Sequence, residues 1–142
     1  MKLAARIIAI GFAGMVMLFS ACSGEKDYAR NFDTSNVPPL CFYDFAKYEK
    51  GGFTAIGWAA DKEDGAPLKK IIVYVDGKAV GEAKYYTDRS DVVSMYKNER
   101  WLKSGWRVSV KIPLEKGPHT SMALAYDQDE ALKVAFKDFT VE

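Results

Sequence analysis

Short strand-like segments separated by turn residues fill the sequence from residue 40 to residue 141. In the clearest of them, residues 106–112, apolar and polar side chains alternate, which is the period of a half-buried strand. Asp76-Gly77 follows a β-branched run and is typical of a type I′ hairpin turn, because both residues tolerate positive φ. Seven such segments, with no helix of domain size, predict a seven-stranded β-sandwich; a small barrel is the alternative.

The predicted strands are separated by Gly, Pro and Asp-rich turns, and Gly51-Gly52 separates the first two. In the last strand Val134 and Phe136 alternate out of phase with Phe139, which predicts a β-bulge there. The first strand begins near Phe42, and the others cover residues 53–60, 71–75, 78–85, 106–112, 119–126 and 132–141.

The N-terminus carries a different signal. Lys2 and Arg6 precede an apolar run over residues 7–19, and Ser20-Ala21-Cys22 follows. This order is typical of a secretory signal peptide, and the run is short for a membrane span. The stretch that ends at Cys22 resembles the lipobox of bacterial lipoproteins, which implies cleavage after residue 21 and a lipid, including palmitate, on Cys22. An uncleaved N-terminal anchor is the alternative, and either reading places the domain outside the cytoplasm.

Three segments are therefore predicted: a lipoprotein signal peptide (1–21), a flexible tether (22–39) and a folded domain (40–142). The tether is polar and lacks periodicity, and it includes Pro38-Pro39. The lipid would make the membrane a partner of the chain. By resemblance to the sorting rule of enteric lipoproteins, Ser23 implies the outer membrane if the host is Gram-negative.

Charge and cysteine content narrow the function classes. The chain has 20 Lys and Arg against 19 Asp and Glu, and without Lys2 and Arg6 the mature chain has a net charge of about −1. It therefore lacks the basic excess of a nucleic-acid-binding protein. If Cys22 is lipidated, Cys41 has no partner for an intrachain disulfide. We expect Cys41 to be a buried apolar residue of the first strand, with intermolecular pairing as the alternative.

Six short blocks in the predicted domain carry a family resemblance. Together, and in this order, they resemble a bacterial immunoglobulin-like (Ig-like) domain of exported and surface proteins. The resemblance covers roughly residues 52–141 and implies an Ig-like sandwich in an exported setting, but no activity. The blocks are Gly57-Trp58-Ala59-Ala60-Asp61, Val73-Tyr74-Val75-Asp76-Gly77-Lys78, Arg89-Ser90-Asp91-Val92, Ser104-Gly105-Trp106, Gly117-Pro118-His119 and Ala125-Tyr126-Asp127.

The sequence contains few candidate catalytic residues. His119 is the only histidine, and its neighbours form no nucleophile–base motif. One His and one Cys are too few ligands for a zinc site, so we expect neither an enzyme nor a cofactor. We interpret His119 as a structural hydrogen-bonding residue beside a turn. Trp58 and Trp106 are interpreted as core aromatics, and Gly57 leaves room for a facing group.

Two acidic turns, at residues 61–67 and 127–131, hold the remaining chemical candidates. Asp61 and Asp127 are interpreted as turn caps that accept backbone N–H groups. The alternative is a calcium site to which both contribute, because calcium is bound by carboxylate and carbonyl oxygens.

The connection over residues 86–104 is the segment most informative about function, because long connections are often functional. We expect Arg89 to pair with Asp91 or the backbone. Antiparallel neighbours would bring this connection to the same end as both acidic turns. We predict a surface there that binds an envelope protein, with a glycan as the alternative. The candidate contact residues are Tyr86, Arg89, Tyr96, Arg100 and Trp101.

Overall fold

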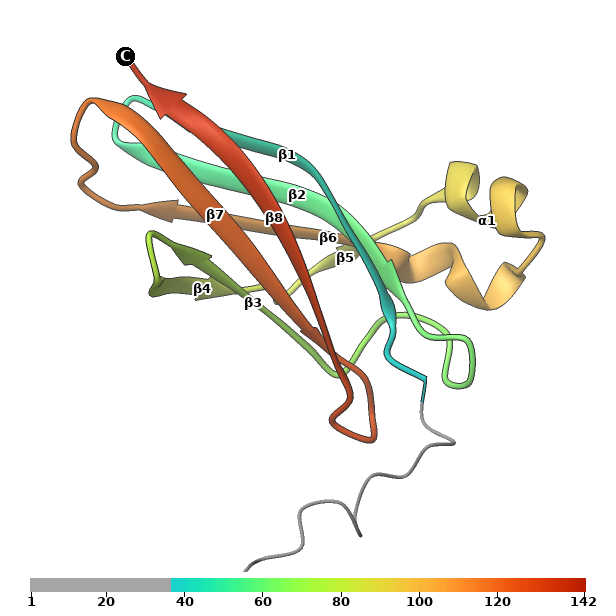
Figure 1. Ribbon diagram of the computed structural model, residues 1–142. Helices are drawn as coiled ribbons and strands as arrows, with labels where there is room; N and C mark the ends of the chain where they lie inside the picture. Colours follow the sequence, from blue (N-terminus) through green and yellow to red (C-terminus); the bar gives the residue numbers. More distant parts are fainter. Residues whose placement is uncertain (1–36) are drawn as a thin grey trace, which may run out of the picture. The chain divides into compact units, whose positions relative to one another are not determined.

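The computed structural model describes residues 37–142, which form two four-stranded antiparallel sheets packed face to face (Figure 1). The predicted signal peptide and Cys22 lie outside the described residues. One sheet has the order β1-β2-β6-β5 and the other β4-β3-β7-β8. The elements are β1 (Leu40–Glu49), β2 (Gly52–Ala60), β3 (Lys70–Val75), β4 (Lys78–Glu82), β5 (Tyr86–Thr87), α1 (Ser90–Tyr96), η2 (Glu99–Ser104), β6 (Gly105–Lys111), β7 (Gly117–Tyr126) and β8 (Leu132–Val141).

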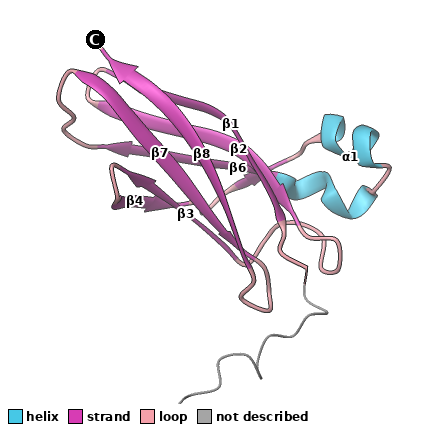
Figure 2. Cartoon of the chain, in the orientation of Figure 1, coloured by secondary structure: helices cyan, strands magenta, loops and turns pink. Residues whose placement is uncertain are grey.

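All seven predicted strands are present, and the prediction of a β-sandwich is confirmed. The structure adds an eighth strand, β5, which pairs Tyr86 with Trp106 and Thr87 with Gly105. In the described part of the chain, helix occurs only between β5 and β6, as Figure 2 shows. Neither of these helices has the length and apolar character that crossing a bilayer requires.

The core lies between the sheets and is built mainly from alternate residues of each strand. Phe53 and Ala55 of β2 and Ile71 and Val73 of β3 are all fully buried and belong to the same core cluster. Phe53 also contacts Phe139 of β8, with ring centroids 5.1 Å apart. Burial of apolar surface on this scale is the main force that holds the two sheets together.

Trp106 is buried in the core, as predicted, and Gly57 makes the space for it. A Cβ atom at Gly57 would lie 2.4 Å from the Trp106 ring and 2.1 Å from the carbonyl oxygen of Phe42. The indole also meets Tyr43 edge to face at 5.1 Å. The expectation that Gly57 accommodates a facing group is confirmed.

Trp58 is buried, as expected, but it lies on the other face of β2. The inward residues of β2 are Phe53, Ala55, Gly57 and Ala59, so Trp58 points away from the space between the sheets. It belongs to a second buried cluster with Ala60, Val92 and Trp101. The interpretation of Trp58 as a residue of the sandwich core is therefore wrong, because Trp58 is buried on the opposite face of β2.

The β-bulge predicted in the last strand is absent from the described pairing. β7 and β8 pair in one unbroken register from Gly117 with Val141 to Tyr126 with Leu132. Phe136 lies out of phase because it is on the solvent face, where it is 64% exposed. The register shifts occur elsewhere, between Tyr43 and Phe45 in β1 and opposite residues 73–74 in β3.

Cys41 is a buried residue of β1, 5% exposed, which confirms its interpretation as an apolar core residue. Loss of hydration is the main cause that raises the pKa of its thiol to about 12. The thiol is therefore protonated and unreactive at neutral pH.

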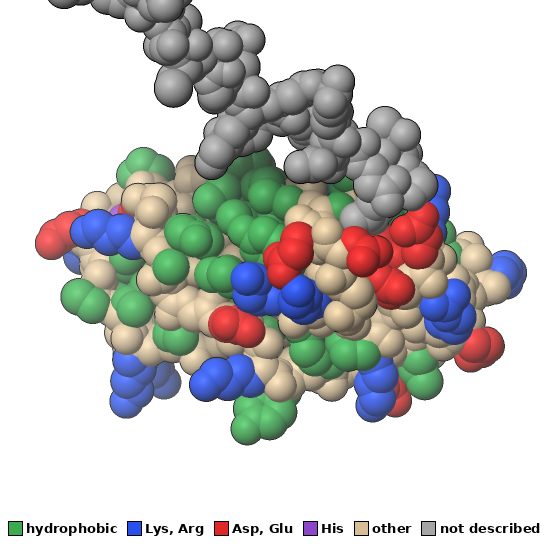
Figure 3. Space-filling view, turned by 90° about the horizontal axis from the view of Figure 1, so that it is seen from below, with side chains coloured by type: hydrophobic (Ala, Val, Ile, Leu, Met, Phe, Trp, Pro, Cys, Tyr) green, Lys and Arg blue, Asp and Glu red, His purple; other side chains and the backbone are tan. Residues whose placement is uncertain are grey.

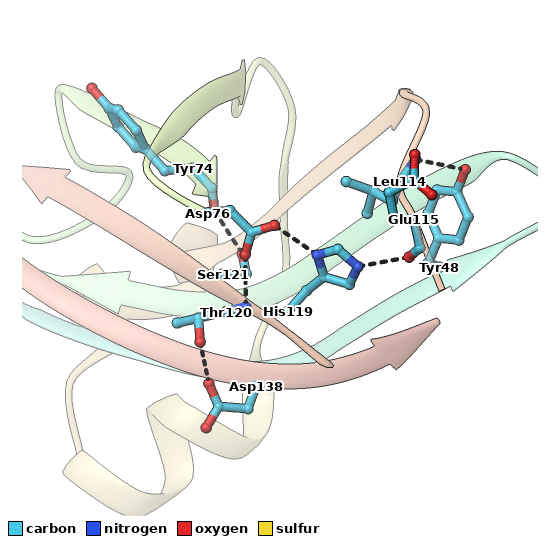
Figure 4. Close-up of polar contacts among 9 residues, drawn as sticks. All are labelled: Tyr48, Tyr74, Asp76, Leu114, Glu115, His119, Thr120, Ser121 and Asp138. Atoms are coloured by element: carbon cyan, nitrogen blue, oxygen red, sulfur yellow. Dashed lines mark hydrogen bonds and ion pairs between the residues drawn. The ribbon is translucent and has the colours of Figure 1, made fainter. Parts of the chain in front are cut away.

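His119 contacts Asp76 of the β3–β4 turn and Glu115 of the β6–β7 loop (Figure 4). The strand register places it at the end of the sandwich opposite the acidic turns. Its Nδ1 lies 2.6 Å from Oδ2 of Asp76, and its Nε2 lies 2.8 Å from the carbonyl oxygen of Glu115. The other carboxylate oxygen of Asp76 accepts the backbone N–H of Thr120. The hydrogen bond from His119 lowers the pKa of Asp76, and the same bond raises the pKa of His119. The histidine is structural, as predicted.

Candidate functional site

Three connections leave the sandwich at the same end, as the strand directions predicted. Leu40 at the start of β1 pairs with Ala60 at the end of β2, and Lys70 at the start of β3 pairs with Tyr126 at the end of β7. The connections 61–67, 86–104 and 127–131 therefore begin at this end (Figure 1). The tight turn at Asp76-Gly77 lies at the opposite end.

Asp61 and Asp127 cap the two acidic turns, and both are 1% exposed. Oδ1 of Asp61 accepts the backbone N–H groups of Glu63 and Asp64, each at 2.7 Å. Oδ1 of Asp127 accepts the N–H of Ala131 at 2.8 Å. These bonds confirm the turn-capping interpretation. Within residues 37–142 no three acidic, His or Cys side chains converge as a metal site, so the calcium alternative gains no support.

The surface around these turns is acidic. Loss of hydration, followed by repulsion from Asp61, Asp64, Asp129 and Asp127, raises the pKa of Glu63. Acidic side chains gather visibly on this side of the molecule (Figure 3). Lys69 offsets part of this charge through its ion pair with Glu130.

The 86–104 connection is an ordered insertion of short elements, which the sequence did not predict. β5, α1 and η2 follow one another with only a few residues between them. α1 ends at Tyr96, and the residue that follows it, Lys97, adopts the left-handed conformation with φ 54°. The side chain of Asn98 then caps η2 by accepting the N–H of Arg100 at 3.1 Å.

Arg89 forms hydrogen bonds within the insertion and between the insertion and β1. Its guanidinium donates two hydrogen bonds to Asp91, at 2.9 and 2.7 Å, and a third to Asp44 at 2.8 Å. The predicted pairing with Asp91 is thus confirmed. The hydrogen bond from Arg89 is the main cause that lowers the pKa of Asp91 to about 2, so the pair stays charged through the ordinary pH range.

Trp101 and Arg100 fasten the insertion to the first acidic turn. Trp101 is 3% exposed, and its Nε1 donates to the carbonyl oxygen of Asp61 at 2.9 Å. Arg100 donates to the carbonyl oxygen of Glu63 and accepts the N–H of Ala66 through its own carbonyl. Of the two roles considered for Trp101, packed anchor and exposed stacking platform, the structure shows the anchor. It is buried because the outer face of β2 needs a cover over Trp58.

Four rings form an aromatic cluster between β1, β2 and the insertion, consisting of Phe42, Trp58, Tyr96 and Trp101. Phe42 stacks on Trp58 at 4.5 Å with an interplanar angle of 14°. Tyr96 lies 5.5 Å from Trp58 and 4.8 Å from Trp101. The two tryptophans are buried, whereas Phe42 is 45% and Tyr96 38% exposed. The cluster thus presents two rings to solvent on a buried support.

Two other residues of the 86–104 connection, Met95 and Tyr86, differ in their exposure. Met95, next to Tyr96 on α1, is 72% exposed. Tyr86 is half-buried, packs against the sandwich core and donates weakly to the carbonyl oxygen of Leu68 at 3.5 Å. Sequence reasoning missed Phe42 and Met95 as exposed candidates. The alternation of Phe42 with Cys41 and Tyr43 was the available signal for Phe42, whereas Met95 had none.

Comparison with known proteins finds no family and only distant structural similarities. No family model matches the sequence, and no curated protein matches it. Among solved structures, the chain is similar to the PKD1 domain of Vibrio anguillarum Epp, with 15% identity and a TM-score of 0.49 over 75% of this chain and 96% of that chain. It is also similar to the Family 28 exopolygalacturonase of Yersinia enterocolitica, with 12% identity and a TM-score of 0.35 over 70% of this chain and 20% of that chain.

Proposed function

We propose that this protein is a non-catalytic, lipid-anchored interaction module of the cell envelope that binds a protein partner. The observation that carries the proposal is the exposure of Phe42, Met95 and Tyr96 at one end of the sandwich. Phe42 and Tyr96 both pack on Trp58, and Met95 directly precedes Tyr96 in α1. Exposed aromatic and Met side chains are typical of protein-binding surfaces. We call Phe42, Met95 and Tyr96 the contact patch.

The contact patch is supported by a fixed framework, which reduces the entropy lost on binding. Trp101 is hydrogen-bonded to the 61–67 turn, and Arg89 joins the insertion to β1. Phe42 and Tyr96 both lie against Trp58, so their rings keep their relative position. A partner would meet a preformed surface.

A protein partner fits this surface better than a glycan does. Sugar recognition needs polar side chains that remain free to bond hydroxyl groups. Here the guanidinium of Arg89 is held by two carboxylates, and Arg100 bonds the backbone of Glu63. The polar groups of the insertion therefore stabilise the insertion itself, and the side chains left exposed in the contact patch are mainly apolar.

Anchoring through Cys22 is supported by the N-terminal sequence, which lies outside the described residues. The lipid would hold the chain at the membrane, and Ser23 favours the outer membrane of a Gram-negative host. β1 begins at the same end of the sandwich as the contact patch. This arrangement suits a partner that is itself embedded in the membrane or anchored to it.

Site-specific photo-crosslinking in cells tests the proposal. The full-length protein carries a photoreactive amino acid in place of Met95, and its matched control carries it in place of Phe136. Phe136 is 64% exposed on the outer face of the other sheet. We expect a discrete protein adduct from position 95 and none of the same mass from position 136.

The outcomes separate the hypotheses. An adduct that resists protease but is shortened by a glycosidase would support the glycan alternative instead. The same protein adduct from both positions, or none from position 95, would contradict the contact patch as the binding surface.

A further inference from the structure

A groove runs along β2 on the outer face of the β1-β2-β6-β5 sheet. β2 is a central strand, and its outward residues become smaller toward the β1–β2 hairpin, from Ile56 through Thr54 to Gly52. The strands on either side carry longer side chains in the same rows: Lys47 opposes Thr54 from β1, and Lys111 opposes Gly52 from β6. Small residues between long ones leave a groove of about 630 Å³. This volume is within the ordinary range for small-ligand sites.

The charges around the groove are mostly positive. Four cationic side chains line it, together with a single acidic one, Glu49. Glu49 is paired with Lys47 at 2.8 Å, which leaves Lys50, Arg107 and Lys111. In the described part of the chain none of these three makes an ion pair. The groove thus holds a local positive excess in a chain whose formal net charge is +1.

Apolar and hydroxyl groups complete the lining. Phe45 is 42% exposed, and its row continues across Ile56 of β2 to Arg107 of β6. In the next row the hydroxyl oxygens of Thr54 and Ser109 lie 3.4 Å apart. Three rows spaced by two residues each span about 14 Å along the strands. The groove therefore offers a ring face, hydroxyl groups and cations along one line.

We infer that this groove binds a carboxylate-bearing oligosaccharide, such as a glucuronate oligomer. The flat faces of sugar rings would pack on Phe45 and Ile56, and their hydroxyl groups would bond Thr54 and Ser109. The carboxylates would be bound by Arg107 and Lys111. The Nε–H of Arg107 donates a hydrogen bond to the hydroxyl oxygen of Ser109 at 3.1 Å. The two terminal NH₂ groups of Arg107 would therefore bind the carboxylate.

The groove is separate from the contact patch, so this inference does not depend on the proposed function. The groove begins at Phe45 and extends toward the β1–β2 hairpin, whereas Phe42 and Trp58 lie toward the other end of the same sheet. A simple anionic headgroup would use the cations alone, and an acidic peptide would have little use for the hydroxyl pair. The combination of groups favours a sugar acid.

Calorimetric titration of the full-length protein in neutral detergent tests the inference. The probes are a β-1,4-linked tetraglucuronate and cellotetraose, which has the same ring and linkage without the carboxylates. Glycerol phosphate and a tetraglutamate peptide are titrated as anions that are not sugar acids. We expect binding of tetraglucuronate only, weakening with added salt. The double change Arg107→Gln/Lys111→Gln should raise its Kd by roughly tenfold. The matched control Lys62→Gln/Lys84→Gln removes the same charge from exposed sites outside the groove and should leave Kd unchanged.

A second variant separates the shape of the groove from its charge. A Cβ atom at Gly52 would come no closer than 3.4 Å to any neighbour, so Gly52→Leu should fold normally and fill the groove. We expect it to weaken tetraglucuronate binding with every charge intact. Unchanged binding in either groove variant would overturn the inference. Equal affinity for cellotetraose, glycerol phosphate or a tetraglutamate peptide would also overturn it, because the surface would then not select a sugar acid.

Discussion

Gly57 has no room for a side chain, and the change Gly57→Ala tests how much the fold depends on this close packing. A Cβ atom would lie 2.1 Å from the carbonyl oxygen of Phe42 and 2.4 Å from the ring of Trp106. Folded proteins do not hold carbon atoms this close to backbone oxygens. Either β1 must move away from β2, or the buried indole of Trp106 must leave its position.

The cost can be worked from these two contacts. Forcing an extra methyl group into a well-packed core typically costs about 1–3 kcal/mol. Here one of the contacts is with backbone, which cannot rotate away, so we expect a loss of about 3 kcal/mol or more in the free energy of unfolding. For a domain of this size that loss lowers Tm by roughly 12 °C or more. Urea unfolding followed by tryptophan fluorescence measures it.

Gly52→Ala in the same strand is the matched control. Its Cβ would have 3.4 Å to the nearest atom, so we expect a change below about 0.5 kcal/mol. If Gly57→Ala is as stable as the Gly52→Ala control, the packing of Trp106 against the β2 backbone is not as described, and the reasoning fails.

Three further predictions concern the lipid anchor at Cys22, the insertion at residues 86–104 and the His119–Asp76 pair. Cys22→Ser should abolish metabolic labelling by a clickable palmitate analogue, and persistent label would show another attachment site. Trp101→Phe removes the donor to the carbonyl oxygen of Asp61 and should cost about 1–3 kcal/mol; hydrogen exchange should rise mainly in the insertion, and unchanged exchange would refute this anchor. The His119–Asp76 pair should stabilise the fold most between about pH 4 and 6.5, above the ordinary pKa of Asp76 and below that of His119. Stability should fall as pH rises through the raised pKa of His119 or drops through the lowered pKa of Asp76, and Asp76→Asn should remove this dependence in urea unfolding.

The strands could be predicted because each carries its own local signal. Residues 106–112 alternate in phase with burial on one face, and Asp76-Gly77 forms the expected hairpin with positive φ at both positions. These patterns depend only on neighbours in sequence. β5 escaped prediction because two residues show no periodicity, and its existence depends on pairing with β6.

The candidate site was predictable in position but not in detail. Strand direction alone placed the 86–104 connection beside both acidic turns. Whether an aromatic side chain in that connection is buried depends on the surface beneath it, which periodicity does not reveal. Trp101 is buried because it covers the outward face of Trp58. Phe42 and Met95, which were not predicted as contact residues, are exposed instead.

The outward row of β2 explains why one sheet offers two different surfaces. The inward row is committed to the sandwich core, so its side chains are fixed by packing against the other sheet. The outward row has no such constraint, and its members differ greatly in size. At one end Trp58 is too large and apolar to be left in water, and the insertion that covers it creates the contact patch. At the other end Gly52 and Thr54 leave space between longer neighbours, which creates the groove. Substitution along this one row can therefore alter either surface while the inward row, and with it the fold, stays the same.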